Sequence, residues 1–273
     1  MANSKGLAAK IKKDVFSMLN KAQASHIGGC LSSLDIVSVL YEEILRIKPS
    51  KPKAANRDRF ILSPGHNGPT VLSALANKGF FPKSWLGTFT ENKGKISVHI
   101  DNHEVPGAEF STGSLGHGLS VGVGMAMSLR YRKIKAKVFV LLSDGEMNTG
   151  STWEAVMFAS HHKLNNTIAI VDKNKIQSFG RTEDIIDLNP LGRKWKSFGW
   201  KVYEVDGHNH KQLKETFLKA KESKTRPVVI ICDTIKGKGL KDMEEKLISC
   251  LLYTSDAADD TPCVDLGARR IIK

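Results

Sequence analysis

Cysteine is scarce in this sequence, and its few copies are not grouped. The chain has 273 residues and four cysteines, Cys30, Cys232, Cys250 and Cys263, with no CxxC pair among them. A disulfide framework or a zinc site requires cysteines at characteristic spacings. Neither is therefore indicated.

Long apolar runs are also missing. Runs such as Val138–Leu142 end far short of the roughly 20 residues that cross a bilayer. The N-terminal stretch MANSKGLAAKIKKDVF has no apolar segment followed by a cleavage site, so it does not resemble a secretory signal. We therefore expect a cytoplasmic location and no membrane partner.

Acidic residues are outnumbered by basic ones. The chain has 41 Lys and Arg against 28 Asp and Glu, a net charge of +13. Such a surface can serve nucleic acid, phosphorylated metabolites or an acidic partner subunit. The basic residues are scattered and lack interleaved aromatic residues, as in KIKK, KPSKPK, RYRKIKAK, GRKWK and KGKGLK. We expect no nucleic-acid partner, and a basic nucleic-acid-binding module is the alternative from outside the enzymes.

Short apolar runs alternate with amphipathic stretches. The predicted strands are Arg59–Leu62, Val138–Leu142, Thr167–Val171, Lys201–Val205 and Val228–Cys232. Helical spacing marks residues 7–23, Leu31–Leu45, Asn67–Asn77, Ser114–Arg130, Ser151–Lys163, Leu191–Gly199 and Lys211–Lys224. This alternation predicts an α/β domain of three α/β/α layers, with a mostly parallel central sheet covered by helices on both faces.

Two segments before the second predicted strand are unusual. The loop from Gly79 to Thr112 is long, and loops of that length are usually functional. The predicted helix Ser114–Arg130 then contains four glycines, at 116, 118, 122 and 124. Each glycine weakens a helix by about 1 kcal/mol. We therefore expect close approach to another backbone or a ligand, or else close helix packing.

The composition changes near the C-terminus. The string CLLYTSDAADD resembles the in-frame translation of a transposase-based sequencing adapter. We therefore predict a folded domain over residues 1–249 and an artefactual or disordered tail over residues 250–273, excluded from the fold. A genuine flexible tail is the alternative.

Two polar side chains follow neighbouring predicted strands. Asp144 and Gly145 come after VFVLLS, and Asn174 comes 30 residues later, after TIAIVDK. Because ligands of such sheets bind beyond the carboxyl ends of strands, both side chains can meet there. A carboxylate and an amide, with a backbone carbonyl and diphosphate oxygens, form an oxygen site suited to Mg²⁺ or Ca²⁺. Gly145 would let the backbone approach a phosphate.

These residues carry a family resemblance. DGEMNTGSTWEA followed by IVDKNKIQ is similar to the thiamine diphosphate motif, with Ser143 in place of the leading glycine. ASHIGG, RDRFILSPGH, VPGAEFSTGSLGHGLS and WEAVMFASHHKL resemble transketolase blocks in order, from about Lys10 to Gly239. The resemblance is closest to the N-terminal subunit of split transketolases. It implies the thiamin diphosphate-binding fold and transfer of a two-carbon ketol unit from a ketose or its phosphate to an aldose or its phosphate.

The resemblance also assigns roles to residues. The implied metal ligands are Asp144, Asn174 and the backbone carbonyl of Ile176. The implied cofactor-binding residues are His66, Gly113, Ser114, Leu115, Gly145 and Asn174. The implied catalytic residues are His26 and His99, although His103 competes with His99 because Ile100 stands where the family has proline.

The resemblance implies a partner chain as well. In the family, the glutamate that activates the cofactor's aminopyrimidine ring comes from a pyrimidine-binding domain, which this sequence lacks. We therefore expect activity only with a C-terminal subunit that carries that domain, in a heterotetramer. Thr149 stands where the family usually has a glutamate, and the family's Trp-His segment after KGKG is not found. The alternatives among enzymes are a subunit like deoxyxylulose-phosphate synthase and one like the α-chain of a 2-oxoacid dehydrogenase.

Overall fold

The computed structural model describes residues 3–241 and 243–246. The predicted domain boundary near residue 249 and the predicted tail over residues 250–273 lie outside the described residues. Within the described part of the chain, no helix is long and apolar enough to cross a bilayer.

A five-stranded sheet forms the centre of the described structure. Its strands are β1 (Arg59–Leu62), β2 (Val138–Ser143), β3 (Thr167–Lys173), β4 (Lys201–Asp206) and β5 (Val228–Asp233). Their order is β1-β2-β3-β5-β4, and every pairing is parallel. All five predicted strands are confirmed. Strands β1, β2, β3 and β5 are almost continuously apolar because both of their faces are covered, whereas the edge strand β4 mixes apolar and charged residues and is partly exposed.

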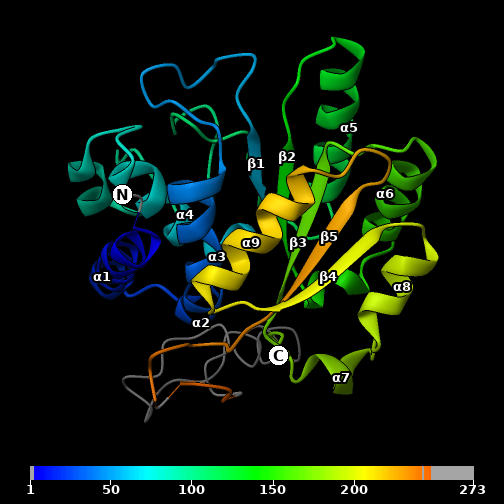
Figure 1. The fold of residues 1–273 in the computed structure, drawn as a ribbon. Helices are drawn as coiled ribbons and strands as arrows, with labels where there is room; N and C mark the ends of the chain where they lie inside the picture. The colour runs from blue at the N-terminus through cyan, green and yellow to red at the C-terminus, as the bar shows by residue number, and fades with distance from the viewer. Residues whose placement is uncertain (1–2, 242, 247–273) are drawn as a thin grey trace, which may run out of the picture.

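Helices cover the two faces as separate layers (Figure 1). One face packs against α1 (Ser4–Ala22), α3 (Leu34–Val39), α4 (Gly68–Asn77) and α9 (His210–Lys221). The other face packs against α5 (Gly118–Tyr131), α6 (Gly150–His161) and α8 (Leu191–Ser197). Successive residues of a strand point to opposite faces, so Phe139 joins the first core and Val140 the second. The predicted three-layer α/β/α fold is confirmed.

Shorter elements connect these layers. They are α2 (Ile27–Ser32), α7 (Thr182–Ile185), the π-helical turn Leu40–Ile44, and the 3₁₀ turns Gly65–Asn67, Lys83–Thr88 and Gly145–Asn148. The predicted helix Leu31–Leu45 is therefore divided between α2, α3 and the π-helical turn.

The glycine-rich helix starts later than the sequence predicts. α5 begins at Gly118 rather than at Ser114, because Gly116 has φ +84° and its N–H donates to Oε1 of Glu146 at 2.7 Å. Close packing explains Gly122, since a Cβ there would lie 2.4 Å from Cγ2 of Val140 on β2. A Cβ at Gly124 would meet nothing within 4 Å. The glycines in the helix thus serve helix–sheet packing at Gly122 and have no such role at Gly124.

Candidate functional site

The carboxyl ends of four strands meet at one edge of the sheet and carry the polar side chains of one cavity. His66 follows β1, Asp144 follows β2, Asn174 follows β3 and Lys236 follows β5. All four residues, with His26 in front of α2, line a cavity of about 190 Å³. The structure therefore brings Asp144 and Asn174 together at the edge where sheets of this type bind ligands.

Asp144 is buried and held by several donors. Its Oδ1 accepts the N–H of Gly145 at 2.8 Å, and its Oδ2 accepts the N–H of Lys175 at 2.6 Å and the hydroxyl of Thr182 at 3.2 Å. Burial, together with the negative charge of Asp172, raises the pKa of Asp144 to about 6 in spite of these bonds. The carboxylate is thus oriented but carries a charge that its surroundings do not balance.

Asp172 forms a second buried carboxylate beneath the cavity. It lies within β3 and accepts hydrogen bonds from the hydroxyls of Ser32, at 2.6 Å, and Thr234. Burial raises its pKa, and these bonds oppose the rise. When ionised, Asp172 adds negative charge near Asp144, and this charge contributes to the raised pKa of Asp144.

Two of the three predicted oxygen ligands, Asn174 and the carbonyl of Ile176, lie on the loop after β3. Oδ1 of Asn174 accepts the N–H of Ile176 at 3.1 Å, and Nδ2 donates to Oγ of Ser32 at 3.3 Å. The carbonyl of Ile176 accepts Nζ of Lys236 at 3.2 Å, so an ammonium group already contacts this predicted ligand. An Asp carboxylate, an Asn amide and a backbone carbonyl fit a hard divalent cation such as Mg²⁺.

No cluster of three or more His, Cys, Asp or Glu within residues 3–241 and 243–246 is placed to hold a metal ion. The predicted set contains a single carboxylate, so it is not a cluster of that kind. The cation would complete its coordination with phosphate oxygens and water, as Mg²⁺ sites commonly do.

Two histidines also line the cavity. The rings of His26 and His66 lie 5.2 Å apart, centroid to centroid. Burial lowers the pKa of His26 to about 4 and that of His66 to about 3, and nearby His99 and Lys236 add to both shifts. Both imidazoles are therefore neutral near pH 7, so each ring has one donor and one acceptor nitrogen.

The structure separates His99 from His103. His99 is close enough to His26 and His66 to lower the pKa of both, and its ring faces Gly113, where a Cβ would lie 3.9 Å from Cδ2. The backbone of His103 instead bonds to Asp101 in an exposed turn. His99 thus lies nearer to His26 and His66 than an exposed turn residue would, but it lines a neighbouring cleft and is not among the residues that line the cavity.

The predicted cofactor-binding residues of the two glycine-containing segments do not all line the cavity. Gly145 and Leu115 are among the residues that line the cavity, whereas Gly113 and Ser114 precede Leu115 and are not part of that lining. Gly65 packs closely on this segment, since a Cβ there would lie 2.9 Å from the nitrogen of Gly113. The loop after β1 thus supports the segment that reaches the cavity.

The sequence reasoning missed Lys236, Asn67 and Gln177, which also line the cavity. Lys236 comes three residues after β5, and the rule that located Asp144 applies equally to that strand. Two residues of the site have left-handed backbone, His26 at φ +80° and Lys175 at φ +69°. Non-glycine residues adopt this conformation at a cost and cluster at functional sites.

The hydroxyl of Thr149 forms hydrogen bonds with residues close to it in the sequence. Its hydroxyl donates to the carbonyl of Glu146 at 2.8 Å and shares a 2.7 Å hydrogen bond with the hydroxyl of Thr152. It also lies against Gly116, where a Cβ would be 2.6 Å from its Oγ1. The Thr149 side chain therefore packs between the start of α6 and the segment before α5.

A second cleft, at the opposite edge of the sheet, is strongly basic. Its volume is about 550 Å³, and its lining includes Arg46, Arg130, Lys133, Lys135, Lys137 and Lys221 with the single acid Asp58. None of its lining residues is aromatic. Single-stranded nucleic acid sites usually offer aromatic rings for base stacking, so this cleft gives the nucleic-acid alternative little support.

Comparisons with known proteins agree with this geometry. Residues 4–248 match the sequence model of a family described as "Transketolase, thiamine diphosphate binding domain". The chain is 41% identical over 235 residues to an apulose-4-phosphate transketolase subunit of Phocaeicola vulgatus, a match that covers 86% of this chain and 83% of that one. It is 38% identical over 239 residues to the 6-deoxy-6-sulfo-D-fructose transketolase subunit SqwG of a Clostridium species, covering 88% and 87%.

Solved structures show the same fold. The transketolase of Campylobacter jejuni superimposes with a TM-score of 0.85 at 30% identity, and the match covers 89% of this chain. It covers 39% of the Campylobacter chain, so this chain spans about two fifths of that enzyme. In contrast, it spans most of the length of the Phocaeicola and Clostridium subunits.

Proposed function

The chain belongs to the transketolase family, in its thiamine diphosphate-binding domain, and from this membership we propose that it is the diphosphate-binding subunit of a two-chain transketolase. The observation that carries the proposal is the meeting of Asp144, Asn174 and the Ile176 carbonyl in one cavity with His26 and His66. The family match covers nearly all of the described residues.

The metal-binding part of the proposal rests on the oxygen ligands. Asp144, Asn174 and the Ile176 carbonyl would hold Mg²⁺, and the cation would favour the ionised form of Asp144, whose pKa is raised by burial and by the charge of Asp172. Gly145 would let a diphosphate approach the backbone. When bound, thiamine diphosphate supplies the nucleophile and the electron sink for cleavage of the bond beside a ketose carbonyl.

The protein's own contribution to hydrogen bonding of the sugar comes from histidines. His26 and the nearby His99 would hydrogen-bond sugar hydroxyls, and the ring of His26, which is neutral near pH 7, can both donate and accept. The low pKa values of His26 and His66 keep both rings uncharged, which suits hydrogen bonding to hydroxyl groups and to the cofactor rather than carrying a proton. We assign substrate contact to His26 and His99, and cofactor contact to His66, Leu115 and the neighbouring Gly113 and Ser114.

Exposed apolar residues near the cavity favour a covering partner. Phe179 lines the cavity and is 74% exposed, and Ile186 nearby in the chain is 52% exposed. Large exposed apolar side chains beside a site mark interaction surfaces. We propose that a second chain with a pyrimidine-binding domain covers them and supplies the activating carboxylate, in a heterotetramer.

The substrates would be sugars with an anionic group. The Phocaeicola and Clostridium relatives carry a phosphate in one substrate name and a sulfo group in the other. A net charge of +13 suits anionic sugars of either kind. The donor would be a ketose or its phosphate, and the acceptor an aldose or its phosphate.

The experiment is calorimetric titration of thiamine diphosphate into the complex of this chain with its partner subunit, with and without Mg²⁺. We expect binding that requires Mg²⁺, loss of binding in Asp144→Ala, and retention in the control Asp184→Ala, whose side chain is exposed on α7. Binding that ignores both the metal and Asp144→Ala would contradict the proposed function. Ketol transfer by this chain alone would contradict the need for a partner.

The alternative functions predict other results. A deoxyxylulose-phosphate synthase-like or 2-oxoacid dehydrogenase α-like subunit would bind the cofactor in the same way, but would release CO₂ from a 2-oxoacid instead of passing a ketol unit between sugars. A basic nucleic-acid-binding module would bind nucleic acid in a salt-sensitive manner that Asp144→Ala leaves unchanged.

A further inference from the structure

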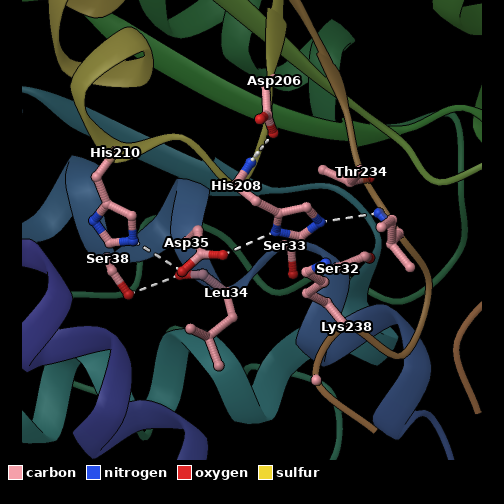
Figure 2. A network of polar contacts seen from close by, with 12 residues as sticks. Ser32, Ser33, Leu34, Asp35, Ser38, Asp206, His208, His210, Thr234 and Lys238 are labelled. Carbon is pink, nitrogen blue, oxygen red and sulfur yellow. Dashed lines mark hydrogen bonds and ion pairs between the residues drawn. The ribbon is translucent and has the colours of Figure 1, made fainter. Parts of the chain in front are cut away.

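A chain of hydrogen bonds connects α3 to the segment after β5 through His208 (Figure 2). His208 lies in the turn between β4 and α9. Its Nδ1 lies 2.8 Å from Oδ2 of Asp35, and its Nε2 accepts the N–H of Ile235 at 3.0 Å. The side chain therefore joins two segments that are distant in the sequence.

The partners of His208 determine its tautomer. The N–H of Ile235 can only donate, so Nε2 must carry a lone pair and Nδ1 must carry the proton. Asp35 suits that arrangement: burial raises its pKa, but hydrogen bonds from His208 and His210 outweigh burial and lower it to about 2. The ionised carboxylate accepts the Nδ1 proton and fixes the ring with Nε2 towards Ile235.

The segment held in this way carries Lys236. Thr234 bonds to Asp172, and the N–H of Gly237 donates to the carbonyl of Gly28 at 3.0 Å. Between these points lie Ile235 and Lys236, whose Nζ enters the cavity and donates to the carbonyl of Ile176. The bond from His208 fixes the backbone one residue before Lys236.

We propose that His208, fixed by Asp35, is a positioning residue that sets the backbone at Ile235 and so places the Lys236 ammonium group beside the predicted diphosphate and metal site. The inference rests on the proposed function for its consequence in cofactor binding. Its structural core, the control of the Ile235 amide by His208, stands without it.

His210 provides a matched control. It bonds to the other oxygen of the same carboxylate, with Nε2 2.9 Å from Oδ1 of Asp35, and its Nδ1 lies 2.9 Å from Oγ of Ser4 on α1. In Figure 2, His210 and His208 lie on opposite sides of Asp35. Loss of His210 disturbs the same carboxylate without removing the acceptor of the Ile235 N–H.

Two substitutions separate the functions of the His208 ring. In His208→Asn the amide nitrogen can occupy the Nδ1 position and donate to Asp35, but no atom reaches Ile235. In His208→Gln the side-chain oxygen can reach the Nε2 position and accept the Ile235 N–H. If His208 acts through Ile235, glutamine therefore rescues what asparagine loses.

The experiment makes two measurements on the complex with the partner subunit. Amide hydrogen exchange follows Ile235, and titration gives the Mg²⁺-dependent dissociation constant for thiamine diphosphate. In His208→Asn we expect exchange at Ile235 and the dissociation constant each to rise roughly tenfold, as expected for a lost hydrogen bond to a buried group. In His210→Gln we expect neither to change by more than about twofold, even if the melting temperature falls.

A double substitution tests whether His208 affects cofactor binding through Lys236. We expect Lys236→Ala to weaken cofactor binding, and His208→Asn added to it to cause no further loss, because non-additivity marks residues that act through one another. Unchanged Ile235 exchange in His208→Asn, equal effects of the His208 and His210 substitutions, or additivity with Lys236→Ala would each overturn the proposal. If the unsubstituted complex binds no cofactor, the proposed function fails, and the exchange measurement still decides whether His208 controls Ile235.

Discussion

The backbone N–H of Lys175 donates to Oδ2 of Asp144 at 2.6 Å, which ties the loop after β3 to the residue that follows β2. The same loop carries Asn174 and Ile176, so this hydrogen bond connects the carboxylate directly to the segment that carries the other two predicted metal ligands. Lys175 has φ +69° in this position. The site thus holds a strained backbone in place through the carboxylate that is expected to bind the metal.

Asp144→Asn should separate folding from cofactor binding. It keeps the size of the side chain and removes a buried charge whose pKa burial and Asp172 raise to about 6. Both oxygens of Asp144 accept backbone N–H groups, so the new NH₂ group must face a donor, and we expect the cofactor-free variant to melt somewhat lower than the unsubstituted chain. In the complex with the partner subunit, the unsubstituted chain should gain about 2.7 kcal/mol at a cofactor concentration 100 times the dissociation constant, and the variant should gain none. Thermal unfolding with and without Mg²⁺ and thiamine diphosphate measures both effects.

The control for that experiment is Asp184→Asn, which removes an exposed carboxylate on α7. It should keep the full gain on adding metal and cofactor. A normal gain in Asp144→Asn would show that the carboxylate is not a metal ligand.

Two glycines of α5 should respond to alanine with opposite signs. A Cβ at Gly122 would lie 2.4 Å from Cγ2 of Val140, so Gly122→Ala should overpack the helix against β2 and cost about 1–3 kcal/mol. A Cβ at Gly124 would meet nothing within 4 Å, so Gly124→Ala should gain up to about 1 kcal/mol from helix propensity. Urea unfolding of the two variants gives the comparison. Equal effects would mean that α5 does not pack on β2 as closely as described.

The strands and the Asp144–Asn174 pair could be predicted from the sequence because their signals are local. Apolar runs such as Val138–Leu142 are read directly, and polar residues that follow them must lie at the carboxyl edge of a parallel sheet. The four-glycine pattern was harder to interpret, because propensity alone does not reveal that Gly116 leaves the helix to bond Glu146.

The contacts of His208 could not be predicted in this way. Asp35 and Ile235 lie 173 and 27 residues from it, and no periodicity links positions that meet only after the sheet has formed. The sequence analysis left both His208 and His210 without a role for that reason. The choice between His99 and His103 was open on similar grounds, since it depends on how the long loop folds back over the cavity.

The stabilisation that Asp35 provides should be lost in acid. Its pKa is lowered to about 2 in the folded chain, below the ordinary value of 3.8. The stabilisation is therefore complete above about pH 4 and is lost as the pH falls towards 2. The shift corresponds to about 2 kcal/mol. We expect Asp35→Asn to have a lower free energy of unfolding than the unsubstituted chain at pH 6. Between pH 6 and pH 3 its free energy of unfolding should fall by less. Urea unfolding at the two pH values measures both differences.

Asp184→Asn serves as the control here as well, and its pH dependence should match that of the unsubstituted chain. If the free energy of unfolding of Asp35→Asn fell between pH 6 and pH 3 by as much as that of the unsubstituted chain, the two histidines would not hold the carboxylate as described.

Glu146 should be important for the stability of the fold, although it is not one of the predicted ligands. It is fully buried, and its carboxylate accepts the hydroxyl of Ser63 and the N–H groups of Gly116, at 2.7 Å, and Ser143, at 3.3 Å. It thereby joins the loop after β1, the segment before α5 and the end of β2. An ionised carboxylate only accepts hydrogen bonds, which suits three donors.

Glu146→Gln replaces one acceptor oxygen by an NH₂ group that must face one of those donors. We expect it to lower the free energy of unfolding by about 1–3 kcal/mol, the cost of leaving buried donors unpaired. The matched control is Glu154→Gln on the exposed side of α6, which should change little. Burial raises the pKa of Glu146, so equal stability of Glu146→Gln and the unsubstituted chain near pH 7 would instead mean that the carboxyl is protonated there. A loss that appears only above the pH at which the carboxyl ionises would measure that pKa directly, and it would show how strongly the Ser63, Gly116 and Ser143 donors favour the charged form.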